Sequence, residues 1–171
     1  METFERKAYE ELASWKKSSQ GSTGLLIEGA RRVGKSTIAE EFGRRNYASY
    51  ILVDFSKAPD DVLDYFVDLR NDLDAFFMYL SSFYGVELHR RDSLIIFDEV
   101  QLYPKAREAI KQLVADGRYD YIETGSLVSI RKNVKDILIP SEEESIRLNP
   151  MDFDEFLWAL GEKPLSTLIA D

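Results

Sequence analysis

Hydrophobic and polar positions follow two kinds of pattern along this chain of 171 residues. Short apolar runs rich in β-branched and aromatic residues are typical of buried strands. We expect five strands, at 25–28, 50–55, 93–99, 119–124 and 145–148. Longer segments carry apolar residues at helical spacing. We expect helices at 2–19, 35–45, 105–115, 127–133 and 153–160, with two more inside 60–84 that divide near Asn71.

Glycine and proline mark the ends of several of these elements. The turn-rich segment 20–24 separates the first helix from the first strand, Pro104 suits the first turn of a helix, and Gly117 ends that helix. Strands that alternate with helices predict an α/β fold in three layers, with a central parallel sheet of about five strands and helices on both faces. We expect one domain over 1–160, followed by a tail or the start of a further region at 161–171.

The loop between the first strand and the next helix has the spacing G-x-x-x-x-G-K-[ST]. Amide groups of such a loop, together with the helix N-terminus, surround the phosphates of a nucleotide. Lys35 then reaches the β- and γ-phosphates, and Ser36 offers a hydroxyl to Mg²⁺. The side chains of Arg31 and Arg32 are expected to point outward. The predicted nucleotide-binding residues are Gly29, Ala30, Arg31, Arg32, Val33, Gly34, Lys35, Ser36 and Thr37.

A second set of candidate residues follows the third and fourth strands. Asp98 and Glu99 come at the carboxyl end of a very hydrophobic run, where ligands of open α/β sheets bind. Asp98 suits a carboxylate that holds Mg²⁺ opposite Ser36, and Glu99 suits a base that orients the attacking water. Thr124 and Ser126 follow the next strand. They either contact the γ-phosphate or the water, or only turn the chain and cap a helix.

Composition narrows the class of protein. The chain has no cysteine and one histidine, which excludes disulfides and a multi-histidine metal site within one chain. A net charge of −9 argues against broad affinity for nucleic acids. The charged N-terminus does not suit a signal peptide, and no apolar run approaches the length that spans a membrane. We therefore expect a cytoplasmic protein.

Four stretches together resemble a family of prokaryotic AAA-like ATPases similar to archaeal ATPases: GARRVGKST, LIIFDEVQLYPKAREAI, YDYIETGSLVSI and IPSEEESIRLNPMDFDEFLWAL. The resemblance covers nearly the whole chain up to Leu160. It implies a five-stranded parallel core, ATP as the nucleotide, phosphate binding by 29–37, and roles in Mg²⁺ and water binding for Asp98 and Glu99. It assigns sensing to Thr124 or Ser126. Family members usually carry a further C-terminal domain similar to restriction endonucleases, whereas this sequence ends at Asp171.

Other charged and aromatic positions have simpler interpretations. Arg118, Arg131 and Arg147 are candidates for an arginine finger, and the sequence does not choose among them. The acidic run 142–144 is expected to be a solvated segment before an edge strand, and His89 is expected to be exposed. The aromatic residues of 76–84 are expected to pack a core rather than to stack on bases.

The sequence favours ATP binding and Mg²⁺-dependent hydrolysis, with ADP and phosphate as products. The output is expected to go to a protein partner, to a second copy of the chain, or to the absent C-terminal region. Two alternatives stay open. One is an ATP-dependent switch that does not hydrolyse the nucleotide, and the other is a small-molecule kinase with the same phosphate loop.

Overall fold

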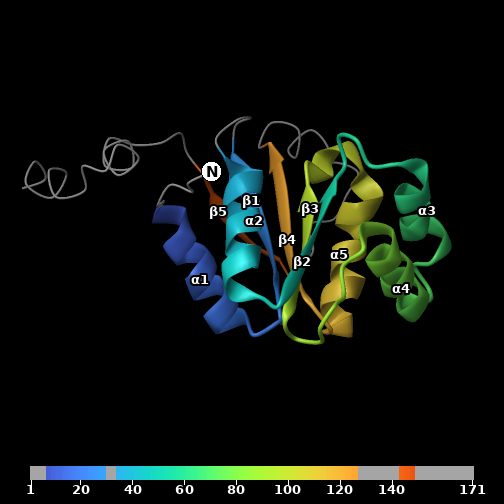
Figure 1. Cartoon of the computed structure of the whole chain (residues 1–171). Helices are drawn as coiled ribbons and strands as arrows, with labels where there is room; N and C mark the ends of the chain where they lie inside the picture. Colours follow the sequence, from blue (N-terminus) through green and yellow to red (C-terminus); the bar gives the residue numbers. More distant parts are fainter. Residues whose placement is uncertain (1–6, 30–33, 127–142, 149–171) are drawn as a thin grey trace, which may run out of the picture.

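Five parallel strands form one sheet in the order β2-β3-β4-β1-β5 (Figure 1). The computed structural model describes residues 7–29, 34–126 and 143–148. The strands are β1 (Gly24–Gly29), β2 (Ser49–Asp54), β3 (Ser93–Asp98), β4 (Asp120–Ser126) and β5 (Glu143–Arg147). All six positions of β3 are buried, as expected for a central parallel strand covered on both faces.

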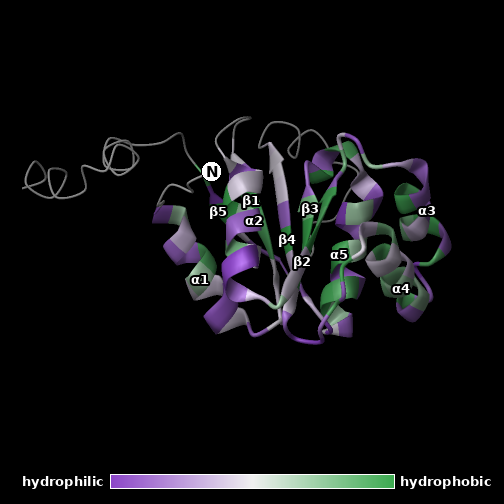
Figure 2. Cartoon of the chain, viewed as in Figure 1, coloured by the Kyte–Doolittle hydropathy of each residue, from purple (hydrophilic) through white to green (hydrophobic). Residues whose placement is uncertain are grey.

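Helices cover both faces of this sheet, which confirms the predicted three-layer α/β fold (Figure 1). The helices are α1 (Lys7–Ser19), α2 (Lys35–Asn46), α3 (Asp60–Asp68), α4 (Leu73–Tyr84) and α5 (Pro104–Asp116). Apolar residues of α1 and α2 pack with Leu25 and Ile27 on one face. Those of α3, α4 and α5 pack with Leu26 on the other. This alternation along β1 places a hydrophobic core on each side of the sheet. Figure 2 shows much of β3 in the green of hydrophobic residues, whereas much of α2 has the purple of hydrophilic ones.

The structure moves some of the predicted element boundaries. β4 continues through Gly125 and Ser126, two residues beyond the predicted strand end at 124, because β1 pairs with it up to Gly29 and Ser126. β5 starts at Glu143 rather than at 145. The predicted helices at 127–133 and 153–160, and the first five residues of the helix at 2–19, lie outside the described residues.

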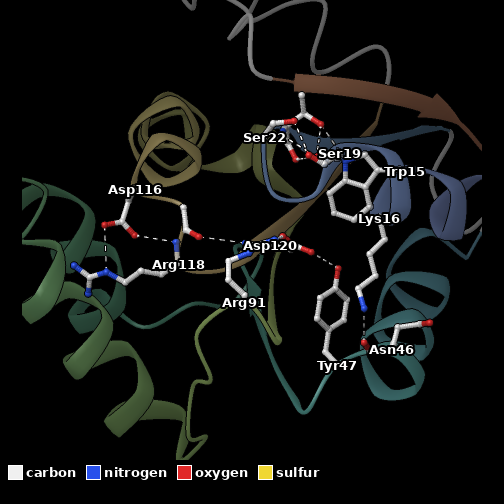
Figure 3. Close-up of polar contacts among 12 residues, drawn as sticks. Trp15, Lys16, Ser19, Ser22, Asn46, Tyr47, Arg91, Asp116, Arg118 and Asp120 are labelled. Carbon is white, nitrogen blue, oxygen red and sulfur yellow. Dashed lines mark hydrogen bonds and ion pairs between the residues drawn. The ribbon is translucent and has the colours of Figure 1, made fainter.

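A polar network joins the amino ends of the strands, at the edge of the sheet opposite the phosphate loop. The Asp120 carboxylate accepts hydrogen bonds from the Tyr47 hydroxyl at 2.6 Å and from the Arg91 guanidinium at 2.8 Å (Figure 3). Burial raises the pKa of Tyr47 far above its usual value, and the Asp120 charge adds to the effect. Arg118 is paired with Asp116 at this same edge, so the candidate finger Arg118 lies away from the phosphate loop of its own chain.

The prediction that residues 142–144 are all solvated is wrong for Glu143. Its side chain is 3 % exposed and forms a two-bonded ion pair with Arg107 of α5, at 3.0 and 2.9 Å. Arg107 also contacts Glu123 of β4 at 3.1 Å. A run of like charges usually stays in water, but here one guanidinium contacts carboxyl groups on two strands. Glu142 lies outside the described residues, whereas Glu144 is exposed, as expected.

Glu123 gives this ion-pair cluster a pH dependence. Burial raises the pKa of Glu123 well above the ordinary glutamate value, and the neighbouring Glu143 raises it further, while Arg107 lowers it. A raised folded-state pKa means that the folded state holds the proton longer. The contribution of Glu123 to the free energy of unfolding is therefore complete below the unfolded-state pKa. It is lost as the pH rises through the folded-state pKa, and the free energy of unfolding then falls by up to about 1.4 kcal/mol per pH unit.

Glu123→Gln, which stays neutral, is therefore expected to lose less stability than the wild type as the pH rises from about 5 to 9. Urea unfolding across this range measures the difference. Replacement of the exposed Glu87 by Gln is the matched control and should follow the wild type. Equal pH dependence of Glu123→Gln and the wild type would contradict the assignment.

Aromatic packing on α4 follows the prediction only in part. Phe76 and Phe77 are buried in the core, but Tyr79 is 48 % and Phe83 45 % exposed. The helix has a single core-facing side, so residues outside it remain in solvent despite their apolar character. His89 is exposed, as expected. In the described part of the chain, no helix has both the length and the apolar character that crossing a membrane requires.

Candidate functional site

The carboxyl ends of three central strands bring the candidate residues to one edge of the sheet. β4 lies between β1 and β3 and pairs with both. Gly29 at the end of β1 pairs with Ser126, and Asp98 ends β3 beside β4. The same edge receives Asp54 from β2, which pairs with Asp98. In open parallel sheets this edge is the usual place for ligand binding.

Helix α2 begins at Lys35, within the phosphate-loop motif. Gly34 has a φ of 91°, a left-handed conformation that favours glycine, and it leads into the helix at Lys35. Lys35 is buried, and its Nζ donates a hydrogen bond to the Gly29 carbonyl at 3.2 Å. Ser36 and Thr37 lie in the first turn of α2, half-buried and exposed respectively. The remaining predicted nucleotide-binding residues, 30–33, lie outside the described residues.

Asp98 is a buried carboxylate at this edge of the sheet. It is 7 % exposed, and burial raises its pKa above the usual aspartate value. The charges of Asp54 and Glu99 raise the pKa further, whereas a hydrogen bond from Thr124 and the Lys35 ammonium lower it. Lys35 and Asp98 therefore act on each other electrostatically, although 63 positions separate them in the sequence (98 − 35). An added divalent cation would strengthen the charged form of Asp98.

Glu99 lies just after β3 in an unusual backbone conformation. Its φ of 56° and ψ of 49° fall in the left-handed region, which few residues other than glycine adopt. The Thr124 hydroxyl accepts a hydrogen bond from the Glu99 amide at 3.0 Å and donates one to Asp98 Oδ1 at 2.5 Å. One hydroxyl of β4 thus fixes both acidic residues, and the strained turn at Glu99 has direct support.

The two small polar residues of β4 occupy different surroundings. The Thr124 side chain is fully buried and is engaged with Asp98 and Glu99. Ser126 ends the strand next to Gly29 and is also buried. Ser126 is therefore the member of the pair that lies beside the start of the phosphate loop. Neither residue starts a helix within the described range, and the alternative that Ser126 caps a helix at 127–133 involves residues outside it.

Two neighbours of the acidic pair were missed by our reading of the sequence. Asp54 ends β2 in register with Asp98, and the signal was present as a second apolar run that ends in Asp. Gln101 lies in η1 (Val100–Leu102), a 3₁₀ helix of three residues. Its Nε2 donates to Glu99 Oε2 at 2.5 Å. The sequence contains no separate signal for this contact, because it depends on the left-handed turn at Glu99.

The donor atoms at this edge suit Mg²⁺, which prefers oxygen ligands and keeps several waters or phosphate oxygens. Asp98 would supply a carboxylate and Ser36 a hydroxyl. Among the residues that the structure describes, no group of three or more His, Cys, Asp or Glu side chains is arranged to hold a metal.

A comparison with known protein families gives a match, and it covers the part of the chain that contains the candidate site. Residues 22–157 match a family model described as an AAA domain. The match includes the phosphate-loop motif, the acidic pair at 98–99 and the end of β4. No curated protein matches the chain.

Proposed function

The chain belongs to the AAA-domain family, and on that premise we propose that it is an ATPase that binds ATP between β1 and α2 and hydrolyses it with Mg²⁺. Membership of this family supports nucleotide binding of the P-loop ATPase class. Mg²⁺-dependent hydrolysis and the roles of single residues are proposals that go beyond family membership. The contacts at the carboxyl edge of the sheet support these two proposals.

The observation that carries the proposal is the placement of Lys35 and Asp98 at the same edge of the sheet. Lys35 Nζ donates to the Gly29 carbonyl at the end of β1, and Asp98 at the end of β3 accepts a hydrogen bond from β4, the strand between them. The buried ammonium at the start of α2 lowers the pKa of the buried carboxylate at the end of β3. A phosphate group with its bound cation needs both a positive donor and a carboxylate at one place. The sequence motif and the fold supply these two groups from separate elements.

ATP would bind with its phosphates against the loop amides of 29–37, the N-terminus of α2 and the Lys35 ammonium. In this arrangement Ser36 and Asp98 would hold Mg²⁺. When bound, Mg²⁺ supplies positive charge that offsets the negative charge developing on the phosphoryl group. Lys35 contributes in the same sense, since its buried side chain hydrogen-bonds to Gly29 at the same edge of the sheet as Asp98.

Glu99 is the proposed general base. Its carboxylate would orient a water molecule and accept a proton as the water oxygen bonds to the γ-phosphorus and the bond to the bridging oxygen of ADP breaks. Thr124 holds Asp98 and the Glu99 amide in place by its two hydrogen bonds. Ser126, beside Gly29, is proposed to sense the γ-phosphate or the attacking water.

The proposal extends to the organisation of the chain. The ATPase domain would occupy residues 1–160, with 161–171 leading into a tail or a further region. Hydrolysis would be coupled to a protein partner, to a second copy or to a C-terminal domain. We propose a cytoplasmic location, which the cysteine-free composition of the sequence permits.

Removal of Mg²⁺ tests the reaction class. Chelation with EDTA is expected to lower phosphate release from ATP by at least about 100-fold, because the charge of the transferring group is then uncompensated. Addition of excess Mg²⁺ should restore the rate. Release that is unaffected by EDTA would contradict the proposal, and so would transfer of labelled γ-phosphate to a metabolite instead of water.

A further inference from the structure

Gln101 is a buried amide directly beside the proposed base. It is 7 % exposed and lies two residues after Glu99 in η1. Its Nε2 donates to Glu99 Oε2 at 2.5 Å. The Gln101 side chain therefore contacts one of the two carboxylate oxygens of Glu99, and it does so from a buried position.

The backbone of this turn fixes Gln101 relative to Glu99. The Leu102 amide donates to the Glu99 carbonyl at 3.0 Å, and the Tyr103 amide donates to the Val100 carbonyl at 3.1 Å. Val100 is fully buried in the core between the sheet and α3–α5. With the Glu99 amide also held by Thr124, both ends of the Gln101–Glu99 contact are anchored.

A glutamate side chain has three rotatable bonds, and an unrestrained carboxylate loses entropy each time it meets a water molecule in one geometry. The hydrogen bond to Oε2 removes part of this freedom and leaves Oε1 to accept a proton. A neutral amide also suits this task better than Lys or Arg, because a cation would stabilise the carboxylate and reduce its strength as a base.

We propose that Gln101 is a positioning residue for the reaction: it holds Oε2 of Glu99 so that the carboxylate faces the attacking water. This inference rests on the proposed function, since it requires Glu99 to be the base. Gln101 acts only through Glu99 and does not touch the nucleotide. Its loss therefore slows the chemical step without weakening ATP binding.

Two substitutions separate the hydrogen bond from simple packing. Gln101→Met keeps a side chain of similar volume and removes the donor, and Gln101→Glu keeps the shape but places a second carboxylate against Glu99. Each variant is expected to lower kcat for phosphate release by about tenfold, with KM for ATP and the affinity for MgATP unchanged. Gln112→Met, at an exposed position of α5, is the matched control and should retain the wild-type kcat.

The Glu99→Gln background tests whether Gln101 acts through Glu99. In single-turnover measurements, Gln101→Met should cause no further loss in that background. An equal loss in both backgrounds would overturn the inference. If Gln101→Met does not fold, as judged by lost MgATP binding, Gln101→Glu decides the question.

The outcomes also distinguish this inference from the proposed function. If Glu99→Gln abolishes phosphate release and Gln101→Met retains the wild-type kcat, or exceeds it, the inference alone is wrong. If Glu99→Gln releases phosphate at the wild-type rate, the proposed function is wrong and the inference falls with it.

Discussion

Replacement of Glu99 by Gln is expected to reduce phosphate release by about 1000-fold, a value within the range that general base catalysis contributes. The amide keeps the size of the side chain but cannot accept the proton from the attacking water. MgATP binding should remain, because the proposed phosphate contacts come from the loop, Lys35 and the Mg²⁺ ligands. Steady-state phosphate release, together with a titration of labelled ATP, measures both effects.

The same substitution separates the ATPase from a nucleotide switch. A switch that binds ATP without hydrolysis would show a low basal rate that Glu99→Gln leaves unchanged. Glu108→Gln, on the exposed side of α5, is the matched control and should hydrolyse ATP like the wild type. If Glu99→Gln releases phosphate at the wild-type rate, Glu99 is not the general base, whatever the affinity of the protein for ATP.

Replacement of Lys35 by Ala is expected to weaken MgATP binding by about 100-fold, or roughly 2.7 kcal/mol, as when one partner of a buried charge pair is removed. The ammonium is buried at the start of α2, where the proposed phosphates would lie. Its loss also removes a positive charge that lowers the pKa of Asp98. Equilibrium titration of ATP, ADP and GTP with and without Mg²⁺ measures the change.

The control for Lys35→Ala is Lys105→Ala, which removes an exposed lysine from the first turn of α5. This variant should bind MgATP like the wild type. Binding of MgATP by Lys35→Ala with the parental affinity would show that the loop has been assigned wrongly. Retained helix content and an unchanged melting profile in circular dichroism would exclude unfolding as the reason for a loss.

Most of the fold could be predicted from the sequence because its signals are local. The apolar run that ends at Asp98 is long enough to specify a buried strand, and the structure confirms β3 in that place. Pro104 begins α5, and Gly117 ends it in a left-handed conformation with φ of 79°. Parallel pairing follows from the alternation of strands and helices. The order of strands, with β4 between β1 and β3, required the structure.

The contacts that the sequence did not predict depend on residues far apart in the chain or on an unusual backbone. Glu143 is paired with Arg107, which lies 36 residues earlier in the chain. The acidic neighbours of Glu143 in the sequence therefore predicted a solvated side chain, which is wrong. Gln101 reaches Glu99 only because the chain turns at a positive φ. The spacing of the phosphate loop and the acidic pair predicted the candidate site, and the structure places Lys35 and Asp98 at the same edge of the sheet. The roles of these residues in catalysis remain predictions.

A crystal structure of Glu99→Gln with bound MgATP tests the central claim most directly. The account predicts that the β- and γ-phosphates lie against the amides that lead into α2 and against Lys35. Mg²⁺ should lie between Ser36 and Asp98, with a water molecule between position 99 and the γ-phosphorus. A nucleotide bound elsewhere on the chain, or a Mg²⁺ ion that Asp98 contacts neither directly nor through water, would contradict the account.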